Sequence, residues 1–140
     1  MVRPVPLLPL VVVALAGCGG GGGSTGAVGG TLPGCAQARQ SVQLPDALAG
    51  LPLPRGSVID HTRKDAAGNT IYGGFVPGDV KGAKEYFEQE LPKAGYDVGE
   101  GDSEDHEAEM EFDGQGAQAR LKVHDIANCP NALTLEVATS

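Results

Sequence analysis

The chain has 140 residues, of which 18 are acidic and ten are basic, so its formal net charge at pH 7 is −8. This excess of acid argues against nucleic acid as a partner and against binding of anionic lipid surfaces by the protein itself, because phosphate groups are bound by clustered Lys and Arg. The length allows one small domain, and its core would be modest, with no Trp, three Phe and three Tyr, so a covalent cross-link would help to stabilise it.

The first 17 residues have the pattern of a secretory signal. Arg3 is the only charged residue before Cys35, and residues 5–16 are apolar except for two prolines. The uninterrupted apolar run, residues 10–16, is far shorter than the ~20 residues that a membrane-spanning helix needs. A basic start, a short apolar run and small residues before a break are typical of an exported protein.

The end of this segment, Leu15-Ala16-Gly17-Cys18, resembles the lipobox of bacterial lipoproteins at all four positions. The resemblance implies cleavage before Cys18, a diacylglycerol on the Cys18 sulfur and often a further acyl chain, such as palmitate, on the new amino terminus. Two or more acyl chains give stable anchoring. The expected location is extracytoplasmic, on the cell membrane or on an outer membrane where the host has one. The alternative is an ordinary secretory signal followed by an unrelated cysteine.

Residues 18–34 are predicted to be a disordered tether, because five consecutive glycines, Gly19 to Gly23, open a stretch that cannot bury enough apolar surface to offset its backbone entropy. Residues 35–140 are then predicted to form a single domain. Its two cysteines, Cys35 and Cys129, lie near opposite ends, and an exported compartment permits a disulfide between them. Two free thiols or a redox pair are the alternatives, although a CxxC motif is absent.

The first half of the domain is expected to contain a short helix or coil around Asp46 and then two strands. Residues 57–63 and 70–76 are rich in β-forming residues, and a Gly-Asn pair between them favours a turn. Gly73-Gly74 inside the second strand indicates a bulge or a close backbone approach, next to a binding groove or a closely packed helix.

The clearest helix is predicted to begin after Asp79, a good N-cap, and to end at Gly95. Its apolar residues recur at helical spacing and form one narrow stripe, which is typical of core packing. Pro92 falls on the solvent side, where we expect a kink or restart. The stripe residues are Val80, Ala83, Phe87, Leu91 and Ala94.

After the helix, residues 96–98 begin a strand or turn and residues 99–103 are expected to be a loop. Residues 105–112, 119–124 and 133–137 alternate between apolar and polar, so they are predicted strands. The turn at residues 113–116 leaves two registers of this hairpin open.

The order of these elements predicts an α+β fold, an antiparallel sheet in the order β-β-α-β-β-β with the helix on one face and water on the other.

Half of the acidic residues fall between Asp97 and Asp113, where there is no Lys or Arg. Clustered oxygen ligands suit Ca²⁺, so one interpretation is a calcium site in a loop; the other is a solvated acidic surface. The candidate ligands are Glu100, Asp102, Glu104 and Asp105.

Catalytic motifs are absent from the sequence: there is no HExxH, no Cys-His cluster and no Gly-x-Ser-x-Gly. If the strands are right, His106 and His124 point to opposite faces and should not share a metal. An envelope hydrolase with an unrecognised site is kept as an alternative.

The stretch from Leu53 to Val137 resembles small lipoproteins of unknown function in high-GC bacteria. It shares with them a Pro-x-Gly-x-Val strand at Pro54–Val58 and a helix that ends in Leu-x-x-x-Gly-aromatic at Leu91–Tyr96. The resemblance implies a non-catalytic envelope domain. Because the chain has an export signal and no catalytic motif, we expect this domain to bind a protein partner or ligand. Its groove is expected near Gly73-Gly74 or on the solvent-facing side of the sheet.

Overall fold

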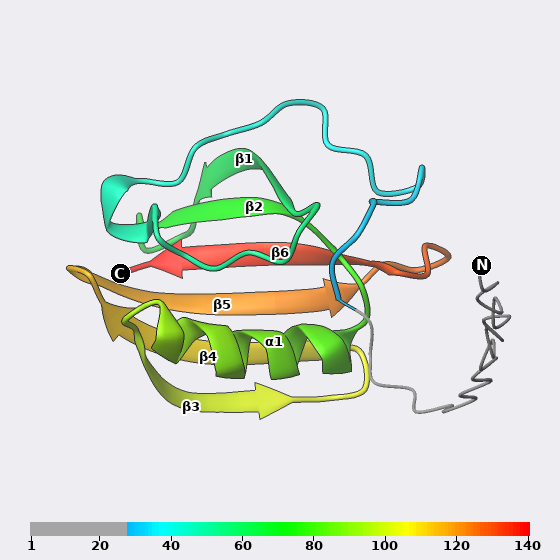
Figure 1. Cartoon of the computed structure of the whole chain (residues 1–140). Coiled ribbons are helices and arrows are strands. Elements are labelled where there is room, and N and C mark those ends of the chain that lie inside the picture. Colours follow the sequence, from blue (N-terminus) through cyan, green and yellow to red (C-terminus); the bar gives the residue numbers. More distant parts are fainter. Residues whose placement is uncertain (1–27) are drawn as a thin grey trace, which may run out of the picture.

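In the computed structural model, the described residues are 28–140, and they form one antiparallel sheet of six strands with a single long helix on one face (Figure 1). The fold class is the predicted α+β. The elements are η1 (Asp46–Leu48), β1 (Val58–Lys64), β2 (Thr70–Pro77), α1 (Val80–Lys93), β3 (Asp97–Ser103), β4 (Glu107–Gly114), β5 (Ala117–Asp125) and β6 (Ala132–Thr139).

The strands lie in the order β1-β2-β6-β5-β4-β3. The chain forms the β1–β2 hairpin, crosses through α1 to the far edge of the sheet and returns strand by strand, so that β6 docks beside β2 (Figure 1). The two edges of the sheet are therefore β1 and β3.

The β3 strand corrects the sequence prediction, in which residues 99–103 were expected to form a loop. The β3–β4 register shifts between Val98 and Gly101, so this edge strand is irregular. A Cβ atom on residue 101 would lie 2.7 Å from the Glu109 carbonyl oxygen, and glycine avoids this clash. Glycines and acidic residues are both uncommon in strands, which is why the composition of β3 indicated a loop.

The β4–β5 hairpin settles the open register, because Gly114 pairs with Ala117 and the turn residues are Gln115 and Gly116. Both turn residues have positive φ, 54° and 81°. Two such residues in sequence define the turn whose twist matches that of the flanking strands.

The helix begins and ends as predicted. The Asp79 carboxylate accepts a hydrogen bond from the Gly82 backbone N–H at 2.7 Å, and Gly95 after the last turn has φ 88°. Pro92 lies exposed in the last turn, where α1 continues through Lys93 without a restart.

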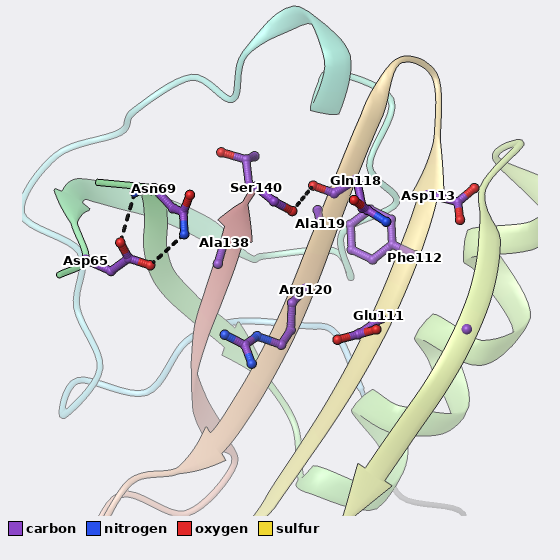
Figure 2. A pocket seen from close by; sticks show the side chains of 12 residues that line it. Asp65, Asn69, Glu111, Phe112, Asp113, Gln118, Ala119, Arg120, Ala138 and Ser140 are labelled. Carbon is purple, nitrogen blue, oxygen red and sulfur yellow. Dashed lines mark hydrogen bonds between the residues drawn. The ribbon is translucent and has the colours of Figure 1, made fainter. Parts of the chain in front are cut away.

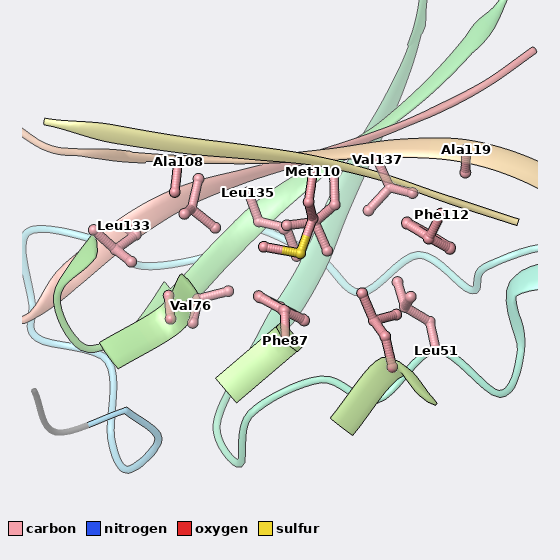
Figure 3. Packing of buried hydrophobic residues seen from close by; sticks show 14 of the residues in the cluster. Leu51, Val76, Phe87, Ala108, Met110, Phe112, Ala119, Leu133, Leu135 and Val137 are labelled. Carbon is pink, nitrogen blue, oxygen red and sulfur yellow. The ribbon is translucent and has the colours of Figure 1, made fainter. Parts of the chain in front are cut away.

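The core lies between α1 and the sheet face that it covers (Figure 3). Phe87 and Leu91 of the helix are fully buried, as are Leu121 and Leu135 of the sheet. The alternation seen in the sequence after the helix is confirmed by burial of the apolar residues of β4, β5 and β6, which are Ala108, Met110, Phe112, Ala119, Leu121, Val123, Leu133, Leu135 and Val137.

The N-terminal segment, residues 28–57, covers the part of this face that α1 leaves open. Leu48 of η1 and Leu51 enter the core, and the Tyr96 hydroxyl donates to the Ala47 carbonyl oxygen at 3.3 Å. The segment also runs along the outside of β1, where the Val42 N–H donates to the Ile59 carbonyl oxygen at 2.7 Å.

A disulfide joins Cys35 of this segment to Cys129 in the β5–β6 loop, with the two Cα atoms 5.7 Å apart. The predicted pairing is therefore present. It fixes the N-terminal segment to the end of the sheet, where Cys129 packs in a small second cluster with Ala36 and Ala132.

Gly74 confirms the predicted close backbone approach. A Cβ atom there would lie 1.9 Å from the Val58 carbonyl oxygen, and β1 carries a bulge between Ile59 and His61. The space over Gly73 on the opposite face is filled by the His61 imidazole, since a Cβ atom there would lie 2.3 Å from His61 Nε2. The Val58 carbonyl group and the His61 imidazole thus fill the space directly over these two glycines.

Candidate functional site

The face of the sheet that points away from α1 is polar, because the side chains of its strands alternate between the core and solvent. We call it the open face and define it by the outward side chains of β1, β2, β6, β5 and β4. These are Arg63, Ile71, Glu136, Ala138, Gln118, Arg120, Lys122, Glu107, Glu109, Glu111 and Asp113.

Three ion pairs cross between strands on the open face. Arg63 Nη2 lies 2.9 Å from Glu136 Oε1. Lys122 Nζ lies 3.0 Å from Glu107 Oε2, and Arg120 Nη1 lies 3.5 Å from Glu109 Oε1.

Each of these pairs is about a third or more exposed, so each contributes at most about 1 kcal/mol to stability. The hydrogen bond from Lys122 to Glu107 raises the pKa of the ammonium group, which therefore stays charged. The pairs keep the strands in register and leave a pattern of alternating charge exposed to solvent.

A hollow of about 430 Å³ lies at one end of the open face (Figure 2). Its floor contains Ala138, which pairs with Ile71 on one side and Arg120 on the other. The small side chain of Ala138 leaves room between its larger neighbours. Polar side chains surround this space: Asp65, Asn69, Glu111, Asp113, Gln118, Arg120 and Ser140.

A second hollow of about 370 Å³ continues along the same face and shares Asp65, Arg120 and Ala138 with the first. The two hollows adjoin each other on the open face, and Arg120 lines both; we call them together the depression.

Asp65 shapes one rim of the depression rather than standing free in it. Its carboxylate accepts hydrogen bonds from the Asn69 side chain at 3.0 Å and from the Asn69 backbone N–H at 2.9 Å (Figure 2). It also accepts one from the Ala67 backbone N–H at 2.9 Å. The Asn69 side-chain bond is the main cause that lowers the pKa of Asp65. Asp65 therefore holds the β1–β2 turn in one conformation.

The chemistry of this surface suits recognition. Among residues 28–140, no Asp, Glu, Lys, Arg or His is buried. The buried ionisable side chain is Tyr96, which packs in the core on the other face of the sheet, and burial raises the pKa of its phenol. Exposed amide, guanidinium and carboxylate groups around a concave floor can form hydrogen bonds and ion pairs with a polar partner.

The four acidic residues considered for calcium lie along the end of β3 and the turn that follows it. Glu100 and Asp102 belong to β3, and Glu104 and Asp105 lie in the turn before β4. No group of three or more His, Cys, Asp and Glu side chains in the described part of the chain is arranged to hold a metal ion.

The two histidines expected on opposite faces instead share one carboxylate, which corrects the prediction. His106 Nδ1 lies 2.8 Å from Asp125 Oδ2, and His124 Nδ1 lies 3.4 Å from Asp125 Oδ1. His106 precedes β4, in a turn where strand alternation does not apply. The hydrogen bond to Asp125, followed by the charges of Asp125 and Asp105, raises the pKa of His106.

The export signal, with Leu15, Ala16 and Gly17, and the lipidation residue Cys18 lie outside the described residues. No helix within residues 28–140 has both the length and the hydropathy needed to cross a bilayer.

Comparisons of the chain with protein-family models, with curated proteins and with solved structures found no match.

Proposed function

We propose that the chain is a bacterial envelope lipoprotein, anchored by lipid on Cys18, whose domain binds a partner outside the cytoplasm. The motif Leu15-Ala16-Gly17-Cys18 supports the anchor. The Cys35–Cys129 disulfide supports the compartment, because structural disulfides form and persist in oxidising environments.

The open face is the observation that carries the binding role. One side of the sheet is covered by α1 and the N-terminal segment, and the other presents a depression lined by polar groups. Several charged side chains on this face are already paired with one another, in the ion pairs Arg63–Glu136, Lys122–Glu107 and Arg120–Glu109. A partner that fits it must carry both hydrogen-bonding groups and charges of each sign.

Site-specific photo-cross-linking in the native host tests this role. A photoreactive residue replaces Gln118, which is exposed on the open face, and a matched reporter replaces Lys81, which is exposed on α1. We expect a discrete adduct from position 118 and none from position 81. Adducts from neither position, or equal adducts from both, would contradict binding through the open face.

A further inference from the structure

The two edges of the sheet differ in charge. Residues 97–113, which include β3, carry nine acidic residues and no Lys or Arg. Residues 35–65, which include β1, carry four Lys or Arg and three Asp. Because β1 and β3 are opposite edges, the acidic domain is electrically polarised across its sheet (Figure 1).

Two arginines on the β1 side are available for a partner. Of the four arginines in the described chain, Arg63 and Arg120 form ion pairs with Glu136 and Glu109. Arg39 and Arg55 are exposed, and neither has a carboxylate oxygen within 4.0 Å among residues 28–140.

A groove lined by both apolar and polar residues lies beside the chain segments that follow these arginines. It has a volume of about 500 Å³ and runs between the N-terminal segment and the beginning of β1. Arg39 and Arg55 each stand two residues before a stretch that lines the groove, and Asp46 is the one acidic residue in its wall. Its apolar walls are formed by Val42, Leu44, Leu51, Leu53, Val58 and Ile59, of which four are only partly buried.

The tether joins the domain at the same place. The Gly30 N–H donates to the Arg55 carbonyl oxygen at 2.8 Å, and Val28 forms a bridge with Gly78. Cys18 stands ten residues before Val28. Ten residues span at most about 36 Å even when fully extended, so a lipid on Cys18 would keep this side of the domain close to the bilayer.

We propose that Arg39, Arg55 and the adjoining groove form a docking surface for the phospholipid bilayer that holds the lipid anchor, an inference that rests on the proposed anchoring through Cys18. The arginines contact lipid phosphates, and the groove receives acyl chains. The net negative charge opposes adsorption of a free domain to an anionic surface, but tethering raises the local concentration of the surface. In this orientation the acidic β3 edge points away from the bilayer, and the open face stays accessible to a partner.

This orientation can be measured on the chain from Cys18 to Ser140. With the disulfide intact, Cys18 is the one free thiol, so it can be coupled to a maleimide phospholipid in vesicles of phosphatidylcholine and phosphatidylglycerol. The chemical coupling replaces cellular lipidation, so the result is independent of whether the host modifies Cys18.

The chain has no Trp, so a single introduced Trp reports its own position. Gln43→Trp places the reporter at an exposed site in the groove wall, and Thr134→Trp places a control at an exposed site on β6. We expect emission from position 43 to shift to shorter wavelength on coupling and to be quenched by lipids with brominated acyl chains. Emission from position 134 should match that of the uncoupled chain. No quenching at position 43, or equal quenching at both positions, would overturn the proposal.

A charge variant tests the role of the arginines. Arg39→Gln with Arg55→Gln should weaken docking on anionic vesicles by about fivefold per arginine. The matched control, Lys81→Gln with Lys84→Gln, makes the same change in net charge on α1 and should leave quenching at position 43 unchanged. Equal effects of the two double variants would show a response to net charge alone and overturn the assignment of this surface.

Discussion

Gly74 on β2 lies against the Val58 carbonyl oxygen on β1, 1.9 Å from where a Cβ atom on residue 74 would be. The clash involves backbone atoms of a paired strand, which cannot rotate away as a flexible side chain can. We therefore expect Gly74→Ala to lower the free energy of unfolding by about 3 kcal/mol, as overpacking in a tight site does. Urea denaturation followed by circular dichroism measures this change.

Gly99→Ala is the matched control, because its Cβ atom would meet the Glu111 carbonyl oxygen at 3.6 Å, an ordinary contact. The free energy of unfolding should change by less than about 0.5 kcal/mol. Similar losses in the two variants would mean that the β1–β2 approach is looser than the structure has it.

The Cys35–Cys129 disulfide should stabilise the domain mainly by restricting the unfolded chain. Its two cysteines are 94 residues apart, so it closes a long loop. Replacing both by Ser should lower the free energy of unfolding by about 2–4 kcal/mol. Cys18→Ser should leave this free energy unchanged in the same urea titration, and a loss as large as that of the double variant would contradict the pairing.

The helix cap offers a third test. Because the Asp79 carboxylate accepts from the Gly82 N–H, Asp79→Ala should destabilise the domain by about 1 kcal/mol. Asp97→Ala removes the same charge from an exposed site on β3 and should have a much smaller effect. A thermal unfolding comparison in which the two variants are equally affected would argue against the cap.

His106 should make stability depend on pH. The hydrogen bond to Asp125 raises the pKa of His106 in the folded state. The stabilisation of the folded state by protonated His106 is therefore fully present below the unfolded-state pKa, about 6.5. It is lost as pH rises through the higher folded-state pKa.

His106→Gln should accordingly lower the free energy of unfolding at about pH 5 and have little effect at about pH 9. Asp125→Asn removes the partner and should abolish this pH-dependent difference. A His106→Gln effect of equal size at both pH values would show that protonation is not involved.

Most of the fold could be predicted from local patterns in the sequence. The Asp79 cap, the apolar stripe that ends at Gly95 and the alternation in β4, β5 and β6 are each visible within a few residues. The position of β6 between β2 and β5 was not predictable in this way, because it depends on contacts between distant parts of the chain.

The prediction was wrong where local composition opposed the tertiary structure. In β3, Gly99 and Gly101 with three acidic residues indicated a loop, but pairing with β4 makes this segment a strand. The alternation rule likewise misplaced His106, which lies one residue before β4 begins.

The site was predicted only in outline. The solvent-facing side of the sheet was foreseen, and alternating side chains gave its charged residues. The depression over Ala138 could not be located, because it arises where a small side chain pairs with Ile71 on one strand and Arg120 on another.

The most direct test of the whole account is the intact mass of the mature protein isolated from its host membranes, followed by mapping of its amino-terminal peptide. The account predicts that the chain begins at Cys18 and carries a diacylglyceryl group on that sulfur. A mature chain recovered from the soluble fraction with an unmodified Cys18 thiol would contradict it.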